Sequence, residues 1–143
     1  MTSNDHRANL RRFIEEIDPN ADVDALPDYV HDDIVLPADI LPNGRQGLEG
    51  LREHMLYLPN IVEHTSTVED MVGDGDRIAA RITVRGTHVG EVLGIPATGK
   101  EWAIDEFMIA HFRHGKISRI WRVADIFSLL QQLGGTPSGQ PVV

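Results

Sequence analysis

Cysteine is absent from the 143 residues of this chain. Without it the chain can form neither disulfide bonds nor thiolate zinc sites, and it has no cysteine nucleophile, which fits a reducing compartment. Close histidine spacings such as H-x-H and H-E-x-x-H are also lacking, so we expect no metal site. Serine-hydrolase and phosphate-loop motifs are missing, and no motif suggests a flavin or nicotinamide, so we expect no cofactor.

Long apolar runs and clusters of basic residues are missing too. No run approaches the ~18 apolar residues of a membrane span, and the N-terminal residues lack an apolar stretch of signal-peptide length. The formal net charge is −9 and the pI is near 5.1, which repels phosphate backbones and anionic lipids. We therefore expect a cytoplasmic protein that binds neither nucleic acid nor a membrane.

What is present is enough sequence for one folded domain. A chain of 143 residues is typical of a single domain that buries its own core, so we predict one domain over residues 1–143. Its ends, residues 1–5 and 136–143, are expected to be flexible tails, since the second contains glycine, serine and prolines.

Helical patterns dominate the first part of the chain. Apolar residues spaced i, i+3, i+4 and i+7 predict an amphipathic helix over residues 6–18, which the Asp18-Pro19 pair ends. These apolar residues are Leu10, Phe13, Ile14 and Ile17. A short helix over 23–31, a brief strand at 34–36 and a third helix that ends at Pro59 are expected next.

From residue 61 onward the pattern changes to the alternation typical of β-strands. A turn at 73–76 joins two predicted strands, and the second alternates between a buried and a wet face. A last hairpin is predicted from Trp102 to Ile126, with its turn at His114-Gly115, before a short apolar turn over 127–133. Helices followed by a long meander predict an α+β fold, in which helices cover one face of a strongly curved antiparallel sheet and enclose a pocket in a cone.

Asp125, near the end of the last predicted strand, is the first candidate for catalysis. It shares a strand face with Trp121 and Val123, because side chains alternate with a period of two. One interpretation is that Asp125 follows these apolar neighbours inward, where burial would raise its pKa and suit it to acid/base work. The other is that Asp125 ends the strand and caps the following turn.

Histidines supply further candidates. His111 lies on the facing strand of the same hairpin; it could polarise a carbonyl beside a carboxylate, or it could be an ordinary surface histidine, and counting does not settle its direction. His88 continues the buried face of its strand, so it either lines a pocket or is a hydrogen-bonded histidine at a strand end. Asp105 and Glu106 point to opposite faces, so at most one of them joins the pocket.

A series of short motifs runs from Val68 to Gly134. They are Val68-Glu69-Asp70, Gly75 to Arg81, Gly86 to Gly90, the loop Gly94 to Lys100 with the pattern GxPxTG(K/R), His114 to Ile117, and Leu130 to Gly134, together with Trp121 and Asp125. In this order and at these spacings they resemble the SnoaL-like polyketide cyclase family.

That resemblance implies a cone of the nuclear-transport-factor-2-like type, the shape that the periodicity also predicts. In this family an aspartate on the last strand is the general acid/base of an intramolecular aldol closure, and the matching position is Asp125. A histidine on the preceding strand assists, and the matching position is His111. His88 matches a histidine common in the wider family, and the resemblance also favours a homodimer or homotetramer.

The resulting hypothesis is a cofactor-independent cyclase of a hydrophobic, polyketide-derived small molecule. Asp125 and His111 would be catalytic, and substrate would contact an apolar wall with His88; the wall residues are Trp121, Phe107, Met108 and Ile109. The same pocket would also suit an isomerase, a dehydratase, an epoxide-opening enzyme or a pericyclic cyclase. A small-molecule-binding module without catalysis is the remaining alternative.

Overall fold

The computed structural model describes residues 2–41 and 43–135. Their helices and strands occur in the following order: α1 (Ser3–Arg12) with a π-helical continuation (Phe13–Ile17), a 3₁₀ turn (Val23–Ala25), α2 (Leu26–Tyr29), β1 (Val30–Val35), a 3₁₀ turn (Ala38–Ile40), α3 (Gly47–Tyr57), a 3₁₀ turn (Leu58–Asn60), β2 (Val62–Asp74), β3 (Arg77–His88), β4 (Glu101–Arg113), β5 (Lys116–Ala124) and α4 (Ile126–Gln132). None of the helices in these ranges has both the length and the hydropathy needed to cross a bilayer.

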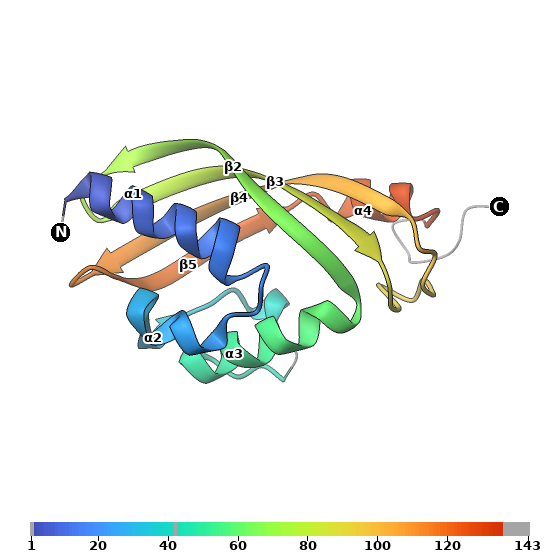
Figure 1. Ribbon diagram of the computed structural model, residues 1–143, viewed down its shortest axis with the longest axis horizontal. Helices are drawn as coiled ribbons and strands as arrows, with labels where there is room; N and C mark the ends of the chain where they lie inside the picture. Colours follow the sequence, from blue (N-terminus) through green and yellow to red (C-terminus); the bar gives the residue numbers. More distant parts are fainter. Residues whose placement is uncertain (1, 42, 136–143) are drawn as a thin grey trace.

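The strands form one curved sheet in the order β1-β5-β4-β3-β2 (Figure 1). Strands β2 to β5 are an antiparallel meander, and α1, α2 and α3 lie on one side of it (Figure 1). The predicted α+β class is therefore confirmed. The sheet is mixed rather than wholly antiparallel, because β1 pairs in parallel with β5. A parallel pair needs a long connection between its strands, and here all of α3 and β2–β4 provides it.

Helix α1 covers the middle of the sheet. It starts earlier than predicted, because Thr2 and Asp5 form a reciprocal capping box, so residues 3–5 are helical rather than part of a flexible tail. The expected tail at 136–143 lies outside the described residues. At its other end the helix widens into the π-helical turn, in which the Asp18 N–H donates to the Phe13 carbonyl at 3.0 Å. Asp18 follows directly after this widened turn, a feature that is frequent at functional sites.

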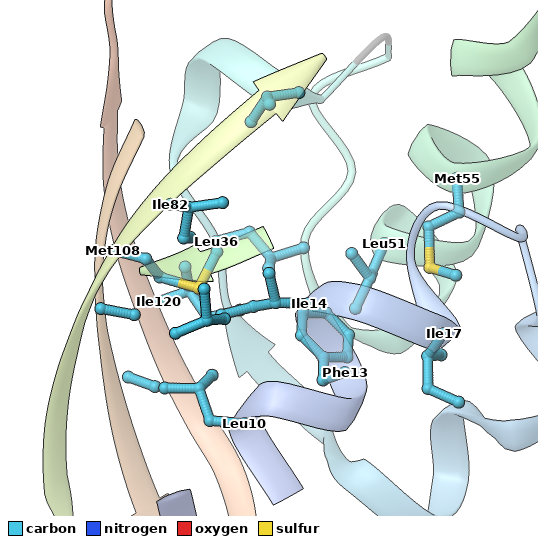
Figure 2. Close-up of a cluster of buried hydrophobic side chains, with 14 of the residues drawn as sticks. Leu10, Phe13, Ile14, Ile17, Leu36, Leu51, Met55, Ile82, Met108 and Ile120 are labelled. Carbon is cyan, nitrogen blue, oxygen red and sulfur yellow. The ribbon is translucent and has the colours of Figure 1, made fainter. Parts of the chain in front are cut away.

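The core lies between α1, α3 and the concave face of the sheet (Figure 2). The helix residues predicted to share an apolar face are all buried, and so are Ile78, Ala80, Ile82 and Val84 of β3. The even-numbered residues from Trp102 to Phe112 point the same way in β4, while β5 turns Ile120 inward. One face of the meander is therefore packed against the helices, and its other face is open to solvent.

Candidate functional site

A cavity of about 190 Å³ lies between the concave face of the sheet and the helices. Most of its lining is apolar, from the π-helical turn, α3 and strands β2 to β5. The ionisable side chains of the lining are Asp18, His54, His64, Glu106 and Arg122. Charged groups in an apolar cavity have strong mutual interactions and make this the candidate active site.

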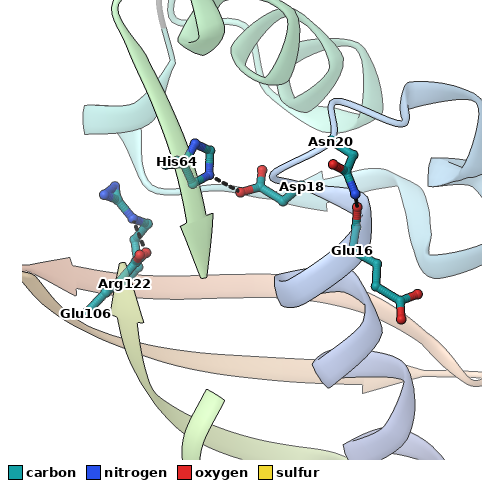
Figure 3. A network of polar contacts seen from close by, with 6 residues as sticks. All are labelled: Glu16, Asp18, Asn20, His64, Glu106 and Arg122. Atoms are coloured by element: carbon teal, nitrogen blue, oxygen red, sulfur yellow. Dashed lines mark hydrogen bonds and ion pairs between the residues drawn. The ribbon is translucent and has the colours of Figure 1, made fainter. Parts of the chain in front are cut away.

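Asp18 and His64 form a pair at one side of the cavity (Figure 3). The Nε2 atom of His64 lies 3.4 Å from Oδ2 of Asp18, and the His64 side chain is only 8% exposed. His64 points inward because it shares a face of β2 with Val62 and Val68, which are buried. With Asp18 ionised, Nε2 carries the proton and donates to the carboxylate, so Nδ1 is left as the basic nitrogen.

Glu106 and Arg122 form a second pair, on neighbouring strands β4 and β5 (Figure 3). The Arg122 Nε donates to Oε1 of Glu106 at 2.7 Å, and the two side chains are 21% and 15% exposed. Arg122 Nη1 also lies 3.7 Å from the carboxylate of Asp39. Because a guanidinium has five N–H donors, Arg122 has donors left for an oxygen atom in the cavity while Glu106 holds its plane in place.

His54 of α3 also lines the cavity. Burial lowers the pKa of His54 below its usual value; Asp18 opposes this shift, and the positive charge of Arg122 adds to it. His54 is therefore neutral at pH 7 and can serve as a polar contact without bringing a charge into the cavity.

The structure does not place Asp125 at the cavity. Asp125 does share a face with Trp121 and Val123, but these are 40% and 74% exposed, so the face is the outer one. The Asp125 carboxylate accepts a hydrogen bond from the Ser128 N–H at 3.0 Å and caps α4. The prediction that it points inward is wrong, and the alternative of a cap is confirmed. A catalytic role for Asp125 stays a prediction that this geometry does not favour.

His111 and most of the predicted apolar wall also lie on the outer face. His111 packs against Trp121 with ring centroids 4.5 Å apart. Phe107 and Ile109 are 56% and 46% exposed, since they alternate with the buried residues of β4. Of the four predicted wall residues only Met108 is buried and lines the cavity. The inward orientation of the other three was wrong, and a catalytic role for His111 stays a prediction.

His88 is fully buried, as its position in β3 predicted. Its Nδ1 accepts a hydrogen bond from the Thr98 N–H at 3.3 Å and lies 2.9 Å from the Thr98 hydroxyl. Its proton is therefore on Nε2, for which the described residues offer no partner. His88 is not among the cavity's lining residues, so the alternative of a hydrogen-bonded histidine at a strand end describes it, and substrate contact stays a prediction.

Sequence reasoning missed most of this site. Glu106 was one of two alternatives, and it is the inward one, while Asp105 is exposed. His64 was not among the predicted catalytic or substrate-binding residues. No group of three potential metal-ligand residues occurs in 2–41 and 43–135. A usable signal was present in the strands, because His64 and Arg122 each occupy an inward position next to a buried residue of the same face, Val62 and Ile120. Asp18 and His54 come from helices and gave no such signal.

Comparisons with known proteins agree with the fold and identify a family. The family model described as SnoaL-like polyketide cyclase matches residues 8–133. Aklanonic acid methyl ester cyclase AcmA of Streptomyces galilaeus is 26% identical over 130 residues, covering 89% of each chain. The corresponding cyclase DnrD of Streptomyces peucetius is 25% identical over 138 residues, covering 91% of this chain and 93% of the relative.

Solved structures agree as well. TsrD from Streptomyces laurentii superimposes with a TM-score of 0.80 at 25% identity, covering 94% of this chain and 98% of that one. IdmH from Streptomyces antibioticus, a putative polyketide cyclase by its description, gives a TM-score of 0.79 at 26% identity, covering 90% and 98%.

Proposed function

Because this chain belongs to the SnoaL-like polyketide cyclase family, we propose that it closes a carbon ring of a polyketide-derived substrate by an intramolecular aldol-type reaction inside the cavity. The observation that carries the proposal is the Asp18–His64 pair in a largely apolar cavity. A histidine oriented by a carboxylate is a recurrent proton-transfer unit. The reaction needs only such a unit and a donor for the developing negative oxygen.

In the proposed reaction His64 moves the proton. Its Nδ1 removes a proton from the carbon next to a substrate carbonyl, and Asp18 stabilises the imidazolium that forms. The resulting enolate carbon attacks a second carbonyl of the same molecule and forms the new carbon–carbon bond. His64 then returns the proton to the new alkoxide, so the product is an isomer of the substrate and the enzyme is unchanged.

Arg122 would stabilise the oxygen on which negative charge develops during ring closure. Its Glu106 partner fixes the guanidinium at 2.7 Å, so the donors are oriented before the reaction begins. Loss of one such oriented donor typically lowers kcat by about 10²–10³-fold. We therefore propose Arg122 as the oxyanion-binding residue.

The cavity favours a neutral, mostly apolar substrate. Its single guanidinium already faces the carboxylates of Glu106 and Asp39, so little positive charge is left for an anionic ligand. A volume of about 190 Å³ is suited to one or two rings, because an apolar cavity of roughly 150 Å³ holds benzene. A larger polycyclic substrate would place its reacting part inside and extend through the mouth.

A second copy of this chain is the partner that we propose for the outer face of the sheet, as in a homodimer or homotetramer. This face has exposed apolar side chains, which are Val72, Phe107, Ile109, Trp121 and Val123. Contiguous apolar patches of this kind mark interaction surfaces. The surrounding charges are of both signs, with Arg81 paired to Asp70 at 2.8 Å and Arg119 over Trp121, so the face can complement itself about a two-fold axis.

The test of the proposed function is a turnover assay with aklanonic acid methyl ester, the compound in the relatives' names, and with smaller aromatic keto esters. Chromatography and NMR would detect an isomeric ring-closed product. We expect His64→Gln to lower kcat by about 10²–10⁴-fold and the outer-face variant His111→Gln to stay close to wild type. Binding without conversion of any of these compounds would contradict catalysis and support a binding module.

A further inference from the structure

We propose that the indole N–H of Trp102 binds a carbonyl oxygen of the substrate inside the cavity, and that Gly86 is the residue that makes this possible. The inference rests on the proposed function, since it assigns a further contact within the same cavity. It identifies the ligand class as a neutral ketone or ester with its carbonyl group on the buried part of the molecule.

Trp102 lies in one cross-strand row with the proposed base. His64 of β2 pairs with Gly86 of β3, and Gly86 pairs with Trp102 of β4. His64 and Trp102 both line the cavity, and only one glycine separates them across the sheet. A substrate carbonyl held by Trp102 would therefore lie near the base that removes its neighbouring proton.

Gly86 gives the indole its position. A Cβ atom at residue 86 would lie 2.5 Å from Cζ2 and 2.9 Å from Cε2 of Trp102, closer than real Cβ contacts. The indole thus crosses directly over the β3 backbone. Cε2 is the atom bonded to Nε1, so the N–H edge lies at this crossing, on the concave face of the sheet.

The Trp102 indole N–H is buried without an acceptor among the described residues. Trp102 is 7% exposed, and among residues 2–41 and 43–135 its Nε1 has no hydrogen-bond partner. Buried tryptophan N–H groups normally have a partner, because leaving one unsatisfied is costly. The indole N–H only donates and does not ionise, so the fitting ligand atom is the oxygen of a neutral carbonyl.

The proposed arrangement separates the tasks of two donors. Trp102 would hold the carbonyl whose neighbouring carbon loses its proton to His64, and Arg122 would bind the carbonyl that is attacked. Because the Trp102 donor is neutral, it stabilises an enolate less strongly than a cation would and releases the product more easily.

The experiment uses two probes of nearly the same shape, 2-acetylnaphthalene and 2-ethylnaphthalene, of which only the first has a carbonyl. In ¹⁵N-labelled protein the chain's 2 tryptophans give separate indole N–H signals, which Trp121→Phe assigns. We expect the ketone to move the Trp102 indole proton downfield, the ethyl compound to leave it largely in place, and Trp121 to change little with either.

Trp102→Phe completes the test, because it keeps an aromatic wall and removes the donor. We expect it to weaken binding of the ketone by about two- to tenfold more than binding of the ethyl compound, and Gly86→Ala to erase the ketone's preference by displacing the indole. A ketone that binds without moving the Trp102 signal, or with an affinity that Trp102→Phe leaves unchanged, would overturn the inference and leave the proposed function standing. Failure of both probes to bind would contradict both.

Discussion

The two faces of the curved sheet are made by the same strands, but they hold the same kinds of side chain in different surroundings. On the inner face Arg122 and Glu106 pair at 2.7 Å with side chains 21% and 15% exposed. On the outer face Arg81 and Asp70 pair at 2.8 Å with side chains 42% and 64% exposed. Water screens the second pair and not the first, so only the inner pair can act strongly on a bound molecule.

Histidines and carboxylates show the same contrast. His64 faces Asp18 in the cavity, whereas His111 packs on Trp121 outside. Asp18 has a histidine partner, whereas Asp125 caps a helix. The residue types suited to catalysis thus occur on both faces, and the surroundings rather than the residue type identify the site.

The largest expected effect comes from breaking the inner ion pair. Arg122→Ala removes the oxyanion donor and leaves Glu106 without its partner, so we expect kcat to fall by about 10²–10³-fold and the free energy of unfolding to fall by about 3 kcal/mol. Turnover assays and urea denaturation measure the two effects. The outer variant Arg81→Ala is the matched control and should cost less than about 1 kcal/mol; equal losses for both variants would contradict the distinction between the faces.

Adjacent residues of β4 test the same distinction through packing. Met108 is buried and Ile109 is 46% exposed, so we expect Met108→Ala to lower the free energy of unfolding by about 2–4 kcal/mol and Ile109→Ala by less than about 1 kcal/mol. Urea denaturation of both variants at low protein concentration is the measurement. An inverted order would mean that the assignment of the two faces is incorrect.

Self-association should depend on the outer face alone. Val123 is 74% exposed within the proposed contact, and Val123→Asp would place a charge in the apolar contact surface of each copy. We expect the wild type to elute as a dimer or tetramer in size-exclusion chromatography with light scattering, and Val123→Asp as a monomer with unchanged far-UV circular dichroism. A wild-type monomer at all concentrations would refute the homo-oligomer proposal.

The smallest effect concerns pH. The pKa of His54 is lowered in the folded protein, first by burial, so the unfolded chain binds this proton more readily and stability decreases as the pH falls through the usual histidine range. Unfolding free energies at several pH values between 7.5 and 5 should therefore decrease toward acid, and His54→Gln should flatten part of that slope. The pKa of His111 is also lowered, by partial burial and by Arg77, but His111 lies at the surface, so His111→Gln should flatten the slope less.

Much of the fold follows from local sequence patterns. The helical spacing of Leu10 to Ile17 and the alternation in β3 predicted which residues are buried, and in β4 Glu106 and Asp105 do point to opposite faces. These predictions succeed because the side-chain period is a local property of helices and strands. The strand pairing at the sheet edge was harder to predict from the sequence, since the parallel β1–β5 pair joins residues far apart in the chain.

The site could be predicted only in part, for a physical reason that β5 illustrates. Periodicity correctly grouped Trp121, Val123 and Asp125 on one face but did not tell which face is inside. The inward-facing row of β5 contains Arg122 beside Ile120. Hydropathy alone would assign the charged Arg122 to the surface. Its burial is compensated by Glu106 on the neighbouring strand, and the Asp18–His64 pair likewise joins groups separated by 46 residues. Such compensation is visible only in the folded chain.

The most direct test of the claim that the chemistry lies on the inner face compares two carboxylates in one assay. Asp18→Asn and Asp125→Asn remove one negative charge each, and kcat/KM for ring closure is measured for both with the substrate that the wild type converts. The account predicts a loss of about 10²-fold or more for Asp18→Asn, because His64 loses its partner, and a value within about twofold of wild type for Asp125→Asn, since asparagine also caps helices. A severe loss for Asp125→Asn together with full activity of Asp18→Asn would contradict it.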